Sequence, residues 1–213
     1  MGLSKDLLYR ALPRGWRRRH PLMGSGLLAC PAFADPEPLR AEFFTGFEAS
    51  NNYASGYVGG GYAFGKGLYA GSLRLRAIGS FGGYDYDGSL EVGDVWVPTT
   101  FNGDASFAAA LVGYEFQQGR LVTKLFAGIE AVDQHIVPFD PKNSVQGRKV
   151  GARFLAENWI DLSQTLYLSL DATYRTVFQE YWSLARVGYR LRPKLSLGLE
   201  GGALGNQEYN AGR

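Results

Sequence analysis

Apolar and polar residues alternate along most of the chain beyond residue 40. In the segment 120–131, Leu125 and Ile129 fall on one side of an extended chain, and Lys124 and Glu130 fall on the other. The same alternation recurs in three further segments: 73–77, 166–175 and 195–200. A period of two residues is typical of a β-strand with one apolar and one polar face. The pattern therefore predicts an all-β chain.

Nine such segments are separated by turn residues. We predict strands at 41–50, 54–65, 69–82, 105–117, 120–131, 147–158, 164–176, 180–192 and 194–203. The connections after the even-numbered strands are short, whereas 83–104 and 132–146, after the third and fifth strands, are long. Short turns at one end and long loops at the other are typical of outer-membrane β-barrels.

We therefore predict an antiparallel up-and-down transmembrane β-barrel of about 10–12 strands over residues 41–213. A tenth strand begins at 209–213. Because bacterial barrels close with even strand numbers, we expect about one to three strands to be missing at the C-terminus. A soluble β-sandwich alternates in the same way and is the alternative fold.

The first 34 residues differ from the rest. Five arginines precede the uncharged run 21–34, which ends in Ala32-Phe33-Ala34. A basic region, a short apolar stretch and this cleavage pattern predict a signal peptide over 1–34, followed by a short tether over 35–40. The run is shorter than the roughly 20 apolar residues of a spanning helix. Lipidation at Cys30 is the alternative to cleavage after Ala34.

Removal of this leader changes the net charge. The leader carries six Lys or Arg and one Asp, so 22 basic and 20 acidic residues become 16 and 19, and the charge of +2 becomes −3. A mildly acidic protein does not attract nucleic acid, and we exclude nucleic acid as a partner. The remaining chain has no cysteine and one histidine, His135.

An enzyme would depend on His135, in the predicted loop 132–146. The positions two residues away hold Asp133 and Val137 rather than serine, and no Gly-x-Ser-x-Gly motif is present. No second His or Cys follows at metal-ligand spacing. We therefore expect no enzyme activity, no metal and no cofactor. A barrel lipid hydrolase that uses His135 is the alternative.

Two sets of residues bear on ligands. Within the predicted loop 83–104, the stretch from Tyr84 to Phe101 carries four rings beside four acids, and the rings are Tyr84, Tyr86, Trp96 and Phe101. Such rings suit a glucan, and an aromatic girdle at the membrane surface is the other explanation. The second set faces the predicted lumen: Arg74, Arg76, Lys124, Glu130, Arg153, Glu157, Asp171, Arg175, Arg186, Arg190 and Glu200. These charges are expected to pair and leave at most a narrow passage.

The order of several short motifs resembles a known family. The motifs include Phe44-Thr45-Gly46, Gly82-Gly83-Tyr84-Asp85-Tyr86, Asp140-Pro141-Lys142-Asn143, Tyr181-Trp182-Ser183 and Gly188-Tyr189-Arg190. Together they resemble the cellulose biosynthesis protein BcsS family of proteobacteria. The resemblance implies an envelope protein that supports cellulose synthesis or export, with the bilayer, cellulose and cellulose synthase components as partners. It supplies no catalytic residues. A generic small barrel, such as an adhesin, is the alternative.

Overall fold

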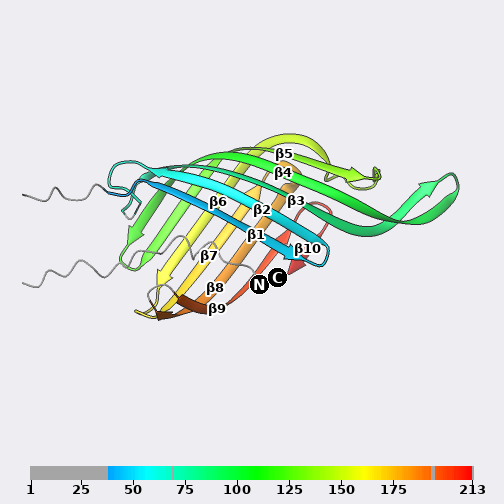
Figure 1. Ribbon diagram of the computed structural model, residues 1–213. Coiled ribbons are helices and arrows are strands. Elements are labelled where there is room, and N and C mark those ends of the chain that lie inside the picture. The colour runs from blue at the N-terminus through cyan, green and yellow to red at the C-terminus, as the bar shows by residue number, and fades with distance from the viewer. Residues whose placement is uncertain (1–37, 69, 193–194, 213) are drawn as a thin grey trace, which may run out of the picture.

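Ten strands and one helical turn make up the part of the chain that the computed structural model describes, residues 38–68, 70–192 and 195–212 (Figure 1). The strands are β1 (Ala41–Ser50), β2 (Tyr53–Ala63), β3 (Leu73–Val92), β4 (Val95–Gln118), β5 (Leu121–Val137), β6 (Gly147–Asp161), β7 (Leu166–Arg175), β8 (Glu180–Arg192), β9 (Leu195–Gly205) and β10 (Asn210–Gly212), and the turn is η1 (Val177–Gln179). The predicted signal peptide and half of the predicted tether lie outside the described residues.

All ten strands belong to one antiparallel sheet, in which each strand pairs with its neighbours in sequence. This confirms the all-β, up-and-down arrangement, and the alternative of a two-sheet sandwich is wrong. Among the described residues β1 and β10 do not pair with each other, so the sheet is not closed.

No helix among the described residues is long and apolar enough to cross a membrane.

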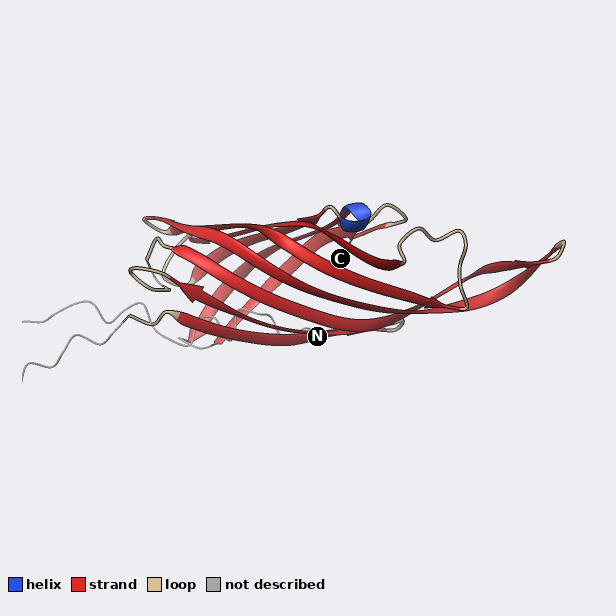
Figure 2. Cartoon of the chain, turned by 90° about the horizontal axis from the view of Figure 1, so that it is seen from above, coloured by secondary structure: helices blue, strands red, loops and turns tan. Residues whose placement is uncertain are grey.

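The prediction of a long loop over 83–104 is wrong. Strands β3 and β4 continue through this segment as a paired hairpin, from Tyr84 opposite Gly103 to Val92 opposite Val95. A two-residue turn closes the hairpin at Gly93, whose φ of 67° suits glycine. Valine and threonine residues in 95–100 favour the extended backbone. The hairpin projects well beyond the rest of the sheet (Figures 1 and 2).

The loop predicted over 132–146 is also shorter than expected. Strand β5 runs to Val137, which lies opposite Asn102 of β4. The extended neighbour β4 supplies the backbone partners that let β5 continue. His135 is therefore part of a strand and not of a loop.

The two faces of the sheet differ in chemistry. One face exposes large apolar side chains, including Phe43, Ile129 and Leu199. The other face buries an apolar cluster, whose members are Phe44, Ile78, Ala109, Leu111 and Phe126, together with most of the ionised side chains. Alternation along each strand sends neighbouring residues to opposite faces.

The sheet is strongly curved (Figure 2). An ion pair between strands that are three apart places the ion-rich face on the concave side. Arg76 of β3 reaches Glu157 of β6 at 2.6 Å. Three strand spacings of about 4.8 Å would separate these strands by roughly 14 Å in a flat sheet. Curvature therefore brings together side chains that the sequence places far apart.

Candidate functional sites

The concave face holds a first ion cluster between β1, β3, β4, β5 and β6. The buried Arg74 donates to Glu115, and Arg76 is held by Glu157. Further ion pairs join these residues to Glu42 and Lys124, at distances from 3.6 to 4.0 Å. Three cations and three carboxylates thus share one cluster. The Arg76 guanidinium also lies over the rings of Phe44 and Phe126, at 5.6 and 4.1 Å from their centroids.

A second cluster lies nearer the β3–β4 hairpin. Glu130 of β5 accepts from Arg153 at 3.4 Å and lies 3.9 Å from Arg175. Arg175 also donates to Glu180. The Phe107 ring is flanked by both guanidinium groups, at 4.6 and 4.7 Å. Two cations and two carboxylates compensate each other here.

Further ion pairs line β6 to β9. Arg186 lies 3.3 Å from Asp171 and 3.1 Å from Glu200. Arg190 pairs with Asp161 at 2.5 Å and lies beside the stacked rings of Trp159 and Tyr167. Arg186 thus pairs with carboxylates on both neighbouring strands, whereas Arg190 reaches past β7 to a carboxylate on β6.

The structure thus places all eleven charged residues named from the sequence on the concave face, in ion pairs. Four acids of the same pairs were missed: Glu42, Glu115, Asp161 and Glu180. The alternation of polar and apolar residues around Glu42 and Glu115 could have identified these two acids, because both fall on the buried side of their strands. Their partners depend on register and curvature, which the sequence does not show.

The predicted aromatic site divides into two parts. Tyr84, Tyr86 and Phe101 form a column, with ring centroids 6.2 and 5.1 Å apart. The Tyr86 hydroxyl donates to Asp140 at 2.7 Å and accepts from Asn143 at 3.1 Å. Burial, together with the hydrogen bond to the Asp140 carboxylate, raises the pKa of Tyr86 to about 12. These rings hold the segment 138–146 against the hairpin.

Trp96 lies apart from this column, near the tip of the hairpin. Its side chain is 49% exposed, and the Lys142 ammonium lies 3.6 Å from the ring centroid. The four rings therefore do not form one binding surface, although both groups contact the segment 138–146.

We call the segment 138–146 the mouth loop. Its Ser144 bonds Glu208 and Gln207 in the turn between β9 and β10. Val145 packs with Val132, Val177 and Phe178. The mouth loop thus links the hairpin to the last turn of the sheet. The sequence places these residues in the predicted loop 132–146, and residues 140–143 in a family motif, but it does not indicate what the segment contacts.

His135 lies on the convex face, opposite Asp104 of β4. Ser106 lies on the same face, two positions along β4 and opposite Asp133. Within the described residues His135 makes no side-chain hydrogen bond, and Asp133 binds Arg148 at 2.7 Å. The spacing of residues in the sequence did not indicate that Ser106 and His135 share a face, because they lie on different strands. No group of three potential metal ligands occurs among the described residues.

These features define an antiparallel up-and-down sheet protein with an apolar convex face and an ion-paired concave face. Residues 42–213 match the family model of the cellulose biosynthesis protein BcsS, and the chain belongs to this family. The match confirms the resemblance found in the sequence motifs. It assigns the protein a role in cellulose biosynthesis. No curated protein and no solved structure matches the chain.

Proposed function

We propose that this protein is an outer-membrane β-barrel that supports cellulose assembly or export without catalysing a reaction. The observation that carries the proposal is a band of uncharged side chains on the convex face. One cross-strand row of this band consists of Phe43, Gly60, Ala77, Ala110, Ile129 and Ala152. A second row consists of Ala41, Tyr62, Leu75, Val112, Ala127, Phe154 and Tyr174. We call this surface the apolar band.

The height of the apolar band supports a membrane role. On β5 the outward positions from Leu121 to Ala131 carry no charge, and the next outward residue is Asp133. A barrel strand needs about 9–11 residues to cross a bilayer. Exposed aromatic pairs, Tyr62 with Phe64 and Tyr114 with Phe116, lie at the opposite end. Such pairs suit a membrane surface.

The charged concave face supports the same proposal, since the interior of an outer-membrane barrel is polar. The predicted signal peptide would supply export. Closure of the sheet, the outer-membrane location and the absence of catalysis are parts of the proposal. Cellulose and components of the cellulose synthesis machinery are the proposed partners.

The test of location uses the full chain refolded with phospholipid vesicles. We expect the strands to be protected from protease in vesicles and the protein to need detergent or lipid to stay in solution. A monomer that is stable in buffer without detergent would contradict the proposal. A deletion strain tests the role in cellulose assembly or export. Cellulose output should fall when the gene is deleted and recover when the parent sequence is restored in the same cells.

A glucan contact at the mouth follows from Trp96. Its exposed ring can stack on the apolar face of a neutral sugar, and such a sugar gains little binding energy from charged side chains. We expect Trp96→Ala to weaken association with soluble cello-oligosaccharides about fivefold, measured by titration in detergent. Val97→Ala, on the other face of the same hairpin, is the matched control. Equal binding by both variants and the parent would remove Trp96 from the glucan contact.

A further inference from the structure

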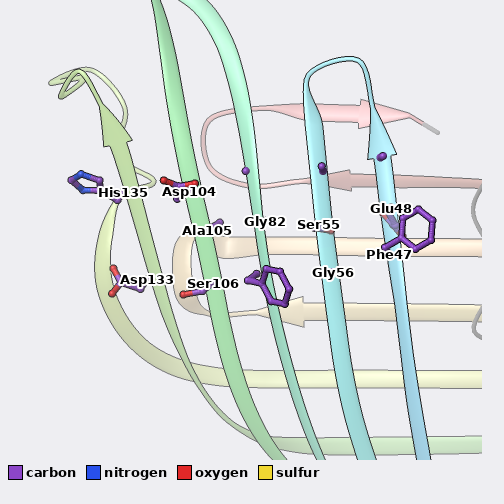
Figure 3. Close-up of a pocket in the computed structure, with 14 residues that line it drawn as sticks. Phe47, Glu48, Ser55, Gly56, Gly82, Asp104, Ala105, Ser106, Asp133 and His135 are labelled. Atoms are coloured by element: carbon purple, nitrogen blue, oxygen red, sulfur yellow. The ribbon is translucent and has the colours of Figure 1, made fainter.

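A groove of about 860 Å³ lies on the convex face at the edge of the apolar band nearest the hairpin (Figure 3). Its floor is made of small residues: Ala49, Ala54, Gly56, Gly82 and Gly83. The rings of Phe47 and Phe81 flank one end, and Asp104, Ser106, Asp133 and His135 line the other. The groove therefore joins an apolar end to a polar end.

The missing side chain at Gly56 shapes the apolar end. Phe47, Gly56 and Phe81 are opposite one another on β1, β2 and β3. A Cβ at position 56 would meet the Phe81 ring at 3.4 Å. The two rings are 62% and 69% exposed, so the gap between them opens outward. A flexible hydrocarbon chain fits a gap of this kind.

The polar end carries one carboxylate that lacks a basic partner. Arg148 donates to Asp133 through two nitrogens, at 2.7 and 3.1 Å. Among the described residues Asp104 has no ion pair, and His135 lies directly opposite it. A carboxylate at the edge of an apolar surface is stabilised by a cation that donates hydrogen bonds. A neighbouring imidazole can donate to an anion bound beside that cation.

We propose that this groove binds a bilayer lipid whose headgroup carries a primary ammonium next to a phosphate. The Asp104 carboxylate accepts hydrogen bonds from the ammonium, and the His135 imidazole donates a hydrogen bond to the phosphate. An acyl chain lies between the two phenylalanine rings. The inference rests on the proposed membrane location. Continuity of the groove with the apolar band favours a lipid over a soluble sugar, which would gain little from the glycine and alanine floor.

The test uses the full chain in vesicles of equal parts phosphatidylethanolamine, phosphatidylcholine and phosphatidylglycerol. Lipids kept after mild detergent extraction are measured by mass spectrometry. We expect phosphatidylethanolamine to be enriched over phosphatidylcholine about threefold to tenfold, because only its ammonium has N–H donors. Asp104→Asn should bring the ratio to about one. Asp94→Asn, in the hairpin turn, removes the same charge and should leave the enrichment unchanged.

A second variant tests the groove rather than the charge. Gly56→Leu fills the gap between the rings and should also abolish the enrichment, whereas Ala110→Leu adds the same side chain to the apolar band and should preserve it. Equal retention of all three lipids by an inserted parent protein would overturn the inference alone. Enrichment of phosphatidylglycerol would overturn it too. Failure to insert into any vesicle would overturn the proposed function itself, and the inference with it.

Discussion

Arg74 illustrates, at the scale of single residues, how this fold holds charge. Its guanidinium is almost fully buried, and so is the Glu115 carboxylate that it contacts. Removing one partner of a buried pair leaves the other charge without compensation. Each of these two charges is therefore stabilised more by the other side chain than by solvent.

We expect Glu115→Ala to lower the free energy of unfolding by about 3–5 kcal/mol, measured by urea unfolding in micelles. The double variant Arg74→Met with Glu115→Leu should recover much of this loss, because one cation and one carboxylate leave together and the rest of the cluster stays balanced. Arg148→Ala breaks an exposed pair with Asp133 and should cost at most about 1 kcal/mol. Similar losses for Glu115→Ala and Arg148→Ala would contradict the assignment of a buried pair.

Tyr86 acts on the mouth loop through its hydroxyl. The Tyr86→Phe variant loses the bonds to Asp140 and Asn143, and we expect trypsin to cleave after Lys142 about fivefold faster. Tyr189→Phe, on the convex face, is the control and should leave the cleavage rate unchanged. An unaltered rate in the Tyr86 variant would show that the mouth loop is held by other contacts.

The same hydroxyl gives a pH dependence. Burial raises the pKa of Tyr86 from 10.0 to about 12. The folded state favours the neutral hydroxyl. The contribution of this hydroxyl to the stability of the folded protein is therefore complete below pH 10 and is lost as the pH rises toward 12. Ultraviolet titration of the phenolate, compared between the parent and Tyr86→Phe, should show one tyrosine that ionises in this upper range. A difference titrating near pH 10 would contradict the assignment.

The strands keep the alternation that the sequence shows, whereas the hairpin of β3 and β4 was not predicted. In β5, the apolar positions face outward and the charged positions inward, as the alternation in the sequence indicates. The hairpin of β3 and β4 was missed because glycines and acids in 82–94 resemble a loop. Its strands form because each supplies the other with backbone hydrogen bonds over the whole length.

Ile129 tests whether the convex face contacts lipid, because its side chain is 67% exposed. Arginine at such a position would cost a water-soluble sheet almost nothing. If the convex face contacts lipid, Ile129→Arg should lower stability by about 2–4 kcal/mol, measured by urea unfolding in vesicles. Val137→Arg lies beyond the apolar band and should cost about 0–1 kcal/mol. Equal tolerance of both variants would contradict the membrane assignment.

The whole molecule combines a curved sheet with paired charges on its concave face. The ion pairs reach across strands as distant as β3 and β6, so they fill the concave side. If the sheet closes into the proposed barrel, we expect the parent protein to conduct ions only weakly in planar bilayers. Replacement of Arg76, Lys124 and Glu157 together by alanine should increase the conductance, because the side chains that cross the interior are removed. A large conductance in the parent would contradict this view of the interior.

The sequence by itself determined the strand-rich fold, the inward and outward sides of most strands, and the family. These properties depend on residues two positions apart or on short motifs, which are local in the chain. Only the tertiary structure decided which charges pair, how the mouth loop is held, and that Asp104 and His135 share a groove. Arg76 and Glu157 are 81 positions apart. Their contact requires the register of three strand pairs and the curvature of the sheet, neither of which is encoded within one segment.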